Sequence, residues 1–466
     1  MHPRTTAFEV VRSIEDAMQG ASIPFAGRYL RAIVVASGLM AGGLAPAAAQ
    51  SAQQLRWCNN EDGATSDMAI DGCTALIKSG NYSGRNLAIA YTNRGSAYDD
   101  KRDEDRAIAD HDQAIRIDPK LDLAYNNRAN AYGRKGEADR AIADYDTAIR
   151  LNPKFAMAYN NRGNNYRRKR DYGRAIADYD AAIRINPKFA DAYNNRGIAY
   201  DDSGEKDRAL ADYTSAIRCD PKFAFAYNNR GLINREKGEY DAAIADFDKA
   251  IAINVRYTSA YRNRGYAYVR KGDYAQAILD LTIVLAIDDR DTEAYAGRGV
   301  AYEKTGDYDS AIADFESIVA ISPQDATALN NRGYAHFYRG DFADAAADLS
   351  RAMPTDPYPS LFRFLAQSRA GQTAFDLESA AQRINSRDWP YPVFEFYLGR
   401  LDAEALLAAA QKPEQRCEAL FYLGEWLTLQ GDRAGARQRL EEAVGSCPKS
   451  FIEHTGAQAE LRRLGP

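Results

Sequence analysis

The sequence predicts an all-α protein: a right-handed α-solenoid, or superhelix, built from antiparallel helix pairs. The first observation behind this prediction is a repeat. The hexapeptide AYNNRG begins at Ala158, Ala192 and Ala226, each time 34 residues after the previous copy. Near-copies at the same spacing begin at Ala90, Ala124, Ala260, Ala294 and Ala328. A fixed period of this length is typical of stacked structural units rather than of one globular core.

The second observation is that each unit contains two helical patterns, which we call helix A and helix B. In the unit that begins at Ala124, small and apolar residues recur at helical spacing until Gly136, and a second such run starts at Ala141. Asn152-Pro153 ends the second run, because the residue before a proline is pushed out of the helical region. Each unit is therefore predicted to be a pair of short helices joined by a glycine-containing turn.

Residues 1–49 differ in composition from the rest of the chain. Arg28 and Arg31 precede an apolar run over residues 32–45, and small residues follow it up to Ala49. This order predicts a secretory signal peptide that is cleaved near Ala49, and hence a periplasmic or secreted protein. The apolar run is too short, and too rich in glycine and proline, for an integral membrane span. An N-terminal membrane anchor that is never cut is the alternative.

The repeats are expected to cover most of the chain after this segment. Residues 50–86 are predicted to form a degenerate capping repeat, because Trp57 lies 34 residues before Tyr91 and Cys73 takes the place of the helix B alanine. Eight tandem units follow over residues 87–357. Proline ends helix B in six of them, whereas Val255 and Asp289 stand in its place in the other two. We expect these two junctions to be less sharply terminated.

The unit resembles the tetratricopeptide repeat (TPR), whose hallmark is an aromatic, a glycine and a tyrosine in helix A, then an alanine, an aromatic and a proline. The aromatic position is tyrosine in every unit except the last, which has Leu329. The small position is glycine except at Ala129. Small residues in both helices let the backbones approach closely, and larger apolar residues fill the space around them.

The 34-residue spacing of the hallmark positions does not continue into the last third of the chain. Residues 358–416 are predicted to be a helical connecting segment, and residues 417–466 one more TPR unit with a closing helix over Phe451–Leu464. The C-terminal part resembles the NlpI-type periplasmic TPR lipoproteins. The motifs that carry this resemblance are LFRFLA at 361–366, EFYLG at 395–399, FYLG at 421–424 and FIEH at 451–454.

The NlpI resemblance implies a dimeric protein of the cell envelope that serves as an adaptor for peptidoglycan hydrolases and proteases. The chain departs from that family in two respects. Ala49-Gln50 stands where the lipid-modified cysteine would be, and the repeat array is longer. Membrane anchoring is therefore in doubt, and the partner need not be the family's.

The cysteines fall at the two ends of the repeat array. Cys417 begins helix A of the last unit and Cys447 ends its helix B, so the two are neighbours in an antiparallel pair. Cys58 and Cys73 lie on the facing helices of the capping repeat. We predict the disulfides Cys58–Cys73 and Cys417–Cys447, each of which would stabilise a terminal unit. Cys219 remains and is interpreted as a buried thiol.

An arginine recurs in helix A of all eight units, and an aspartate follows it sixteen residues later in helix B. The arginines are Arg94, Arg128, Arg162, Arg196, Arg230, Arg264, Arg298 and Arg332. Because the arginine and the aspartate recur at this constant spacing in every unit, we favour an ion pair between them within each unit. A row of cations that faces an acidic ligand is the alternative, and it fails if the aspartates neutralise the arginines.

Asparagine also recurs in helix A, although it is a poor residue for a helix interior. We call one set the inner row: Asn93, Asn127, Asn161, Asn195, Asn229, Asn263 and Asn331. The second row lies beside it: Asn126, Asn160, Asn194, Asn228 and Asn330. Helix A of TPR units lines the concave wall, and some TPR arrays hold the backbone of an extended peptide with such a ladder. An amide suits this task, because it both donates and accepts. Bonds to neighbouring helices or water are the alternative.

Other candidate inward positions change in character along the array. They are polar in the early units (Ser96, Asn130 and Asn164) and apolar in the later ones (Ile198, Leu232, Tyr266, Val300 and Tyr334). A partner segment is therefore expected to meet a polar end and an apolar end. We include Leu232 and Tyr266 among the predicted partner-binding residues.

The sequence does not favour an enzyme. It has no glycine-rich phosphate loop and no G-x-S-x-G motif, and no histidine stands near an obvious nucleophile. Without a CxxC motif or a cluster of its four histidines, we predict no metal site and no cofactor. A net charge of −5 argues against a nucleic-acid partner.

The favoured function is therefore a non-catalytic scaffold or adaptor of the cell envelope, which binds an extended segment of other proteins and can form a homodimer. Two other classes stay open. A glycan- or peptidoglycan-binding module would use the same tyrosine and asparagine side chains. A structural spacer would need neither asparagine row.

Overall fold

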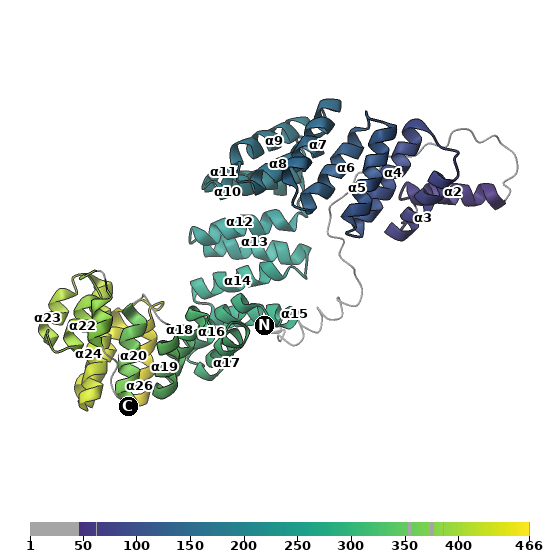
Figure 1. Cartoon of the computed structure of the whole chain (residues 1–466). Coiled ribbons are helices and arrows are strands. Elements are labelled where there is room, and N and C mark those ends of the chain that lie inside the picture. Colours follow the sequence, from purple (N-terminus) through teal and green to yellow (C-terminus); the bar gives the residue numbers. More distant parts are fainter. Residues whose placement is uncertain (1–45, 62, 353–356, 373–376, 385, 466) are drawn as a thin grey trace, which may run out of the picture. The chain divides into compact units, whose positions relative to one another are not determined.

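The computed structural model describes residues 46–61, 63–352, 357–372, 377–384 and 386–465. Within these ranges the chain forms helices joined by turns, without a strand, and consecutive helices pack as pairs (Figure 1). The predicted all-α solenoid is confirmed for this part of the chain. Most of the predicted signal peptide lies outside the described residues, and only its last four residues, 46–49, belong to a described helix. None of the described helices is both long enough and apolar enough to cross a membrane.

The chain divides into two compact units, and the boundary falls between Glu236 and Lys237. The described helices of the N-terminal unit are α2(Pro46–Cys58), α3(Ser66–Lys78), α4(Gly84–Asp100), α5(Glu104–Ile117), α6(Asp122–Arg134), α7(Ala138–Leu151), α8(Ala156–Arg168), α9(Tyr172–Ile185), α10(Ala190–Asp202), α11(Lys206–Cys219) and α12(Ala224–Glu236). From α4 to α12 the even-numbered helices are the predicted helices A.

The described helices of the C-terminal unit are α13(Tyr240–Ile253), α14(Thr258–Lys271), α15(Tyr274–Ile287), α16(Thr292–Thr305), α17(Tyr308–Ile321), α18(Ala326–Arg339), α19(Phe342–Arg351), α20(Pro357–Arg369), α21(Leu377–Gln382), α22(Tyr391–Tyr397), α23(Ala403–Ala409), α24(Pro413–Gln430), α25(Arg433–Ser446) and α26(Ile452–Leu464). Here α14, α16 and α18 are helices A of the regular repeats. Helices α20–α23 lie in the predicted connecting segment, and α26 in the predicted closing helix.

In several of the pairs a glycine in helix A faces a ring in helix B, and this contact sets the spacing of the two helices. A Cβ atom added at Gly163 would lie 2.8 Å from the ring of Tyr179, and one added at Gly197 would lie 2.7 Å from the ring of Tyr213. Both rings are fully buried. Because such a short contact is not tolerated in a close-packed interior, the glycine is required for the two helices to approach.

The two junctions without proline end as sharply as the others, contrary to our expectation. Asn254, the residue after α13, has φ −133° and ψ 95°, and Asp288, the residue after α15, has φ −135° and ψ 96°. Both are close to Asn152, which precedes a proline (φ −135°, ψ 88°). The side chain supplies the reason. Oδ1 of Asn254 accepts a hydrogen bond of 3.1 Å from the backbone N–H of Arg256, and Asn152 makes the equivalent bond of 3.2 Å to Lys154. This Asx turn ends helix B with or without proline.

The closing helix α26 packs against α18, α24 and α25. The hydroxyl of Tyr338 on α18 donates to the carbonyl of Ile452 at 3.0 Å. Nζ of Lys304, on α16, donates to Oγ1 of Thr455 at 2.7 Å. These polar contacts surround an aromatic core in which Phe362 stacks on Phe421, with ring centroids 5.6 Å apart. The end of the chain therefore covers the last regular repeat of its own unit.

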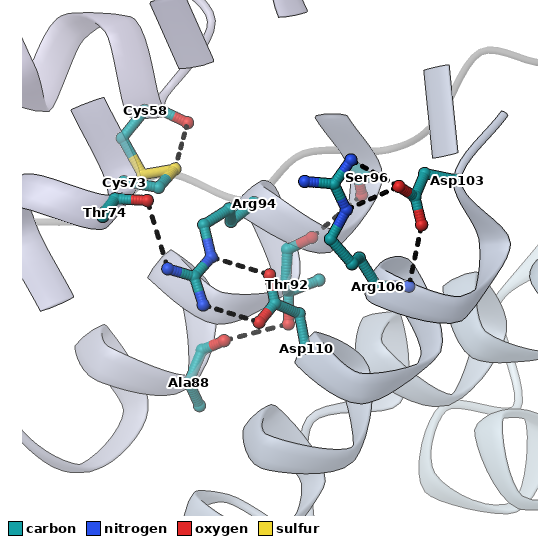
Figure 2. A network of polar contacts seen from close by, with 10 residues as sticks. All are labelled: Cys58, Cys73, Thr74, Ala88, Thr92, Arg94, Ser96, Asp103, Arg106 and Asp110. Atoms are coloured by element: carbon teal, nitrogen blue, oxygen red, sulfur yellow. Dashed lines mark hydrogen bonds and ion pairs between the residues drawn. A yellow bond between two sulfur atoms is a disulfide. The ribbon is translucent and has the colours of Figure 1, made fainter. Parts of the chain in front are cut away.

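The cysteines that the sequence pairs lie together in the structure. Cys58 on α2 and Cys73 on α3 are joined, with Cα atoms 4.6 Å apart (Figure 2). Cys417 on α24 and Cys447 after α25 are joined with Cα atoms 5.0 Å apart. Cys219 is half-buried rather than buried, because it lies at the end of α11, where its thiol faces the carbonyl of Pro187.

Candidate functional site

The recurring arginines are neutralised within their own repeats. Nε and Nη2 of Arg94 each donate to a carboxylate oxygen of Asp110 at 2.7 Å, and Nη1 donates to Thr74 (Figure 2). These bonds to Asp110 raise the pKa of the Arg94 guanidinium above its usual value. The same two-pronged pair occurs at Arg128–Asp144, Arg162–Asp178, Arg196–Asp212, Arg264–Asp280, Arg298–Asp314 and Arg332–Asp348. The favoured ion-pair prediction therefore holds at these positions.

Four amides of the inner row, on α6, α8, α10 and α12, link their helix A to the helix A before it. Nδ2 of Asn161 on α8 donates to Oδ1 of Asn130 on α6 at 3.1 Å. Two further links are Asn195 to Asn160 and Asn229 to Asn194, both 3.0 Å. Asn127 makes the equivalent bond to the hydroxyl of Ser96, also 3.0 Å. These bonds explain why asparagine is retained in a helix interior.

Exposure divides the inner row into two groups. Asn93 and Asn127 are fully buried. The other five amides are half-buried, and they are Asn161, Asn195, Asn229, Asn263 and Asn331. Only this second group lies where a partner could reach it without a rearrangement of the repeats.

Four of the five second-row amides are covered by the neighbouring helices, whereas Asn330 is half-buried. Asn126 is fully buried, and Asn160, Asn194 and Asn228 are each 5% exposed. Their side chains face the inner row: Asn160 donates to Asn161 at 3.3 Å and accepts from Asn195 at 3.0 Å. These four amides thus orient the inner-row amides, and they offer little surface of their own to a partner.

Helix α12 presents a mixed face that the sequence analysis recognised only in part. Phe225, Asn229 and Leu232 follow one another at intervals of four and three residues, so they share one side of the helix. Phe225 is 52% exposed, an unusual value for this residue type in the described chain, and its ring lies beside that of Phe223. Leu232 is half-buried. The signal for Phe225 was present in the sequence as a bulky residue one place before the repeated Ala-Tyr.

The candidate inward positions that were predicted to be apolar and open to a partner are partly covered in the C-terminal unit. Tyr334 is 7% exposed and packs edge-on against Phe362 of α20, with ring centroids 4.9 Å apart. Tyr266 is half-buried, and its hydroxyl donates to the carbonyl of Glu293 at 2.7 Å. The connecting segment thus covers the last of these positions, which repeat spacing alone could not reveal.

Two of the buried carboxyls in the C-terminal unit are Glu418 on α24 and Glu453 on α26. Glu418 accepts hydrogen bonds from Nε1 of Trp389 at 2.6 Å and from the hydroxyl of Tyr358 at 2.8 Å. Glu453 accepts a bond of 3.0 Å from the hydroxyl of Tyr422. Burial, and then the nearby charge of Glu418, raises the pKa of Glu453 to about 8. Glu453 thus joins the closing helix α26 to α24, and Glu418 joins α24 to α20 and to the segment before α22.

Models of the tetratricopeptide repeat match residues 88–121, 126–190, 160–224, 213–245, 262–326, 322–360 and 418–450, and a TPR model matches 231–272. Together they cover most of the chain. This protein belongs to the tetratricopeptide-repeat family. The repeats of this family are non-enzymatic interaction modules, so the protein is a non-catalytic scaffold that binds other proteins or peptides. The likeness of its C-terminal part to NlpI-type lipoproteins stays a prediction.

Three solved structures of TPR proteins are similar to parts of this chain. MamA is 30% identical with a TM-score of 0.32, and the match covers 35% of this chain and 95% of MamA. A tetratricopeptide repeat protein from Parabacteroides merdae is 23% identical with a TM-score of 0.40, covering 53% and 98%. YrrB, described as a TPR protein with an unusual peptide-binding site, is 23% identical with a TM-score of 0.32, covering 41% and 97%.

Proposed function

We propose that this TPR protein is an exported adaptor of the cell envelope that binds an extended segment of a partner protein along the helix A face of its N-terminal unit. The observation that carries the proposal is the face formed by Phe225, Asn229 and Leu232 on α12. Phe225 is half exposed although nearly all large apolar side chains of the described chain are covered. An exposed aromatic side chain next to polar groups is typical of an interaction site.

The amides of the inner row supply the polar part of this surface. Nδ2 of Asn229 donates to Asn194, and its Oδ1 lies 3.5 Å from Nδ2 of Asn228. Nδ2 of Asn195 donates to Asn160. An amide has two N–H donors and an oxygen with two lone pairs, so these contacts use about half of its capacity. A peptide backbone offers the complementary donors and acceptors whatever its side chains are. The neighbouring helices therefore orient the amides and leave part of their hydrogen-bonding capacity for a partner.

The envelope location rests on the sequence and the cysteines. Residues 1–49 have the composition of a signal peptide, and the two joined cysteine pairs occupy the two ends of the described chain. Disulfides persist in oxidising compartments such as the periplasm. The NlpI-like motifs in the last third favour hydrolases or proteases of the envelope as partners, and a homodimer as the assembly.

Site-specific photo-crosslinking tests this proposal. A benzophenone amino acid replaces Phe225 in one variant and Ala211, on the exposed side of α11, in the control. Both proteins are irradiated in cells, and the crosslinked partner is identified by mass spectrometry. A peptide with the crosslinked sequence is then titrated against the purified protein and against Phe225→Ser and Leu232→Ser. We expect crosslinks to one protein segment only from position 225, and at least about tenfold weaker peptide binding by both variants.

Three results would contradict the proposal. Equal crosslinking from positions 225 and 211 would show that the helix A face is not selective. Unchanged peptide affinity in the Phe225 and Leu232 variants would place the binding surface elsewhere. Crosslinks to muropeptides rather than to protein would favour the glycan-binding alternative.

A further inference from the structure

The last regular repeat lacks a contact that the first four repeats share, and it places two possible metal ligands at the same positions. In those repeats an arginine at the start of helix B stacks on a tyrosine near the end of helix A. The pairs, with the distance from Cζ to the ring centroid, are Arg106/Tyr98 at 4.4 Å, Arg140/Tyr132 at 3.9 Å, Arg174/Tyr166 at 4.5 Å and Arg208/Tyr200 at 4.2 Å. The 34-residue spacing places His336 at the tyrosine position and Asp344 at the arginine position of the last repeat. The two positions that form a cation–π pair in the first four repeats therefore hold an imidazole and a carboxylate in the last repeat.

A second carboxylate turns toward the same place. Asp341 is the N-cap residue of α19. Aspartates at this position cap their helices in three other repeats, for example Asp171, which accepts from the backbone of Arg174 at 3.1 Å, and Asp307, which accepts from Ser310 at 3.2 Å. Asp273 makes no such cap. Asp341 makes no such side-chain cap. Its Oδ2 lies instead 3.5 Å from Nδ1 of His336.

The three side chains form a group with the chemistry of a metal site. One ligand atom each of His336, Asp341 and Asp344 lies within 4.8 Å of the other two. Around a tetrahedral zinc ion, with bonds of about 2.0–2.2 Å, ligand atoms are about 3.3–3.5 Å apart. Asp344 is exposed, so a change of its rotamer can supply the remaining approach. The group borders an open pocket of about 460 Å³, which Glu316 also lines.

One nearby side chain, that of Arg339, competes with a metal ion for Asp341. Arg339 pairs with Asp341 and, at 2.6 Å, with Asp309. It can therefore release Asp341 and keep an ion-pair partner. The other nearby arginine, Arg332, is already held by Asp348 at 2.6 Å. The carboxylates outnumber the two arginines, which favours a divalent cation at this place.

We propose that His336, Asp341 and Asp344 bind a divalent zinc-type cation at the turn between α18 and α19. An imidazole nitrogen beside two carboxylates suits zinc, whereas calcium and magnesium prefer oxygen ligands throughout. Three protein ligands leave at least one position for water or for a side chain of a partner. The sequence analysis missed the site because it looked for clusters of histidine and cysteine, and here a single histidine acts with carboxylates across a turn.

Zinc binding to the untagged chain, freed of metal by a chelator, tests this proposal. A Cys219→Ser background removes the one thiol outside the two disulfides. Zinc is added as its chloride, and affinity and stoichiometry are measured by competition with a chromophoric chelator. The key variant is His336→Tyr/Asp344→Arg, which restores the tyrosine and arginine of the first four repeats and should therefore fold. Thermal denaturation monitored by circular dichroism verifies its fold.

We expect the Cys219→Ser protein to bind one zinc ion, and the double variant to bind it at least about tenfold more weakly. Arg339→Ala should bind zinc severalfold more tightly, because the side chain that competes for Asp341 is gone. Equal zinc affinity in the parent and in the folded double variant would overturn the proposal. Weaker binding by Arg339→Ala would also contradict it, since it would show that Arg339 supports the site.

Discussion

Arg196 donates two hydrogen bonds to Asp212, one from Nε and one from Nη2, each 2.7 Å long. The Asp212 side chain is 7% exposed and that of Arg196 is 19% exposed. The third nitrogen, Nη1, reaches Asp180 on helix B of the preceding repeat, whose side chain is 44% exposed. One arginine thus joins its own helix pair to the pair before it, through one buried and one exposed carboxylate.

This difference in burial predicts unequal effects on stability. Asp212→Ala leaves a largely buried guanidinium without its two-pronged partner, and we expect the free energy of unfolding to fall by about 3 kcal/mol. Asp180→Ala removes an exposed ion pair and should lower it by no more than about 1 kcal/mol. Urea unfolding monitored by circular dichroism measures both. Equal losses in the two variants would show that burial does not distinguish the pairs.

The regular period revealed the helix pairs and the Arg–Asp pairing, because both depend on spacing within one unit. Position alone could not show what a side chain bonds to in the next unit. The amides of Asn160 and Asn161 are adjacent in the sequence, yet one is buried and the other half-buried. Tyr334 fits the apolar series, but α20 covers it, and α20 lies outside the repeat. Contacts made by irregular segments are not encoded in the period.

Phe225 shows a second reason why the sequence alone could not predict the whole partner surface. Its residue type was visible in the sequence, but most large apolar residues of a repeat are buried, and composition does not single out the exception. The face it shares with Asn229 and Leu232 becomes evident only when its exposure is known. The candidate partner surface was therefore half predicted: the amide and the leucine from the repeat, and the aromatic residue from the structure.

The buried Glu453 predicts a stability that depends on pH. Its pKa is about 8 in the folded chain against a usual value of 4.5. Between these values the folded carboxyl keeps a proton that the unfolded carboxyl has lost, so stability must fall as the pH rises. The slope is at most about 1.4 kcal/mol per pH unit for one proton. We expect Glu453→Gln to flatten this slope between pH 5 and 8, while the exposed Glu441→Gln leaves it unchanged.

Urea unfolding at a series of pH values measures this slope, with the fluorescence of Trp389 and Trp426 reporting on the C-terminal unit. Buried Glu425, whose pKa is raised to about 7 by burial, should leave part of the slope in Glu453→Gln. A stability that rises from pH 5 to 8 in the unmodified protein would contradict the predicted sign. An identical slope in the Glu453 and Glu441 variants would contradict the assignment to Glu453.

Together with the export proposed above, the cysteine pairs predict the number of free thiols. The chain has five cysteines, and Cys219 is the one that the structure leaves unpaired. Protein purified from the periplasm should therefore react with one equivalent of a thiol reagent under denaturing conditions, and with five after reduction. Cys417→Ser/Cys447→Ser should lower the free energy of unfolding by about 3–4 kcal/mol, since the bond closes a loop of 30 residues. Five reactive thiols before reduction would contradict both pairs.

Arg170 adopts a left-handed backbone with φ +61°, at the turn position where most other repeats have a glycine with positive φ. A side chain costs about 1–2 kcal/mol in this conformation. We expect Arg170→Gly to raise the free energy of unfolding by about 0.5–1 kcal/mol, because the strain relieved exceeds the added freedom of glycine in the unfolded chain. The matched control is Arg168→Gly, two residues earlier at the last helical residue of α8, which should lower stability by no more than about 1 kcal/mol. The urea concentration at the midpoint of unfolding measures both effects. A lower midpoint for Arg170→Gly than for the unmodified protein would mean that a contact of the arginine stabilises the fold by more than the strain destabilises it.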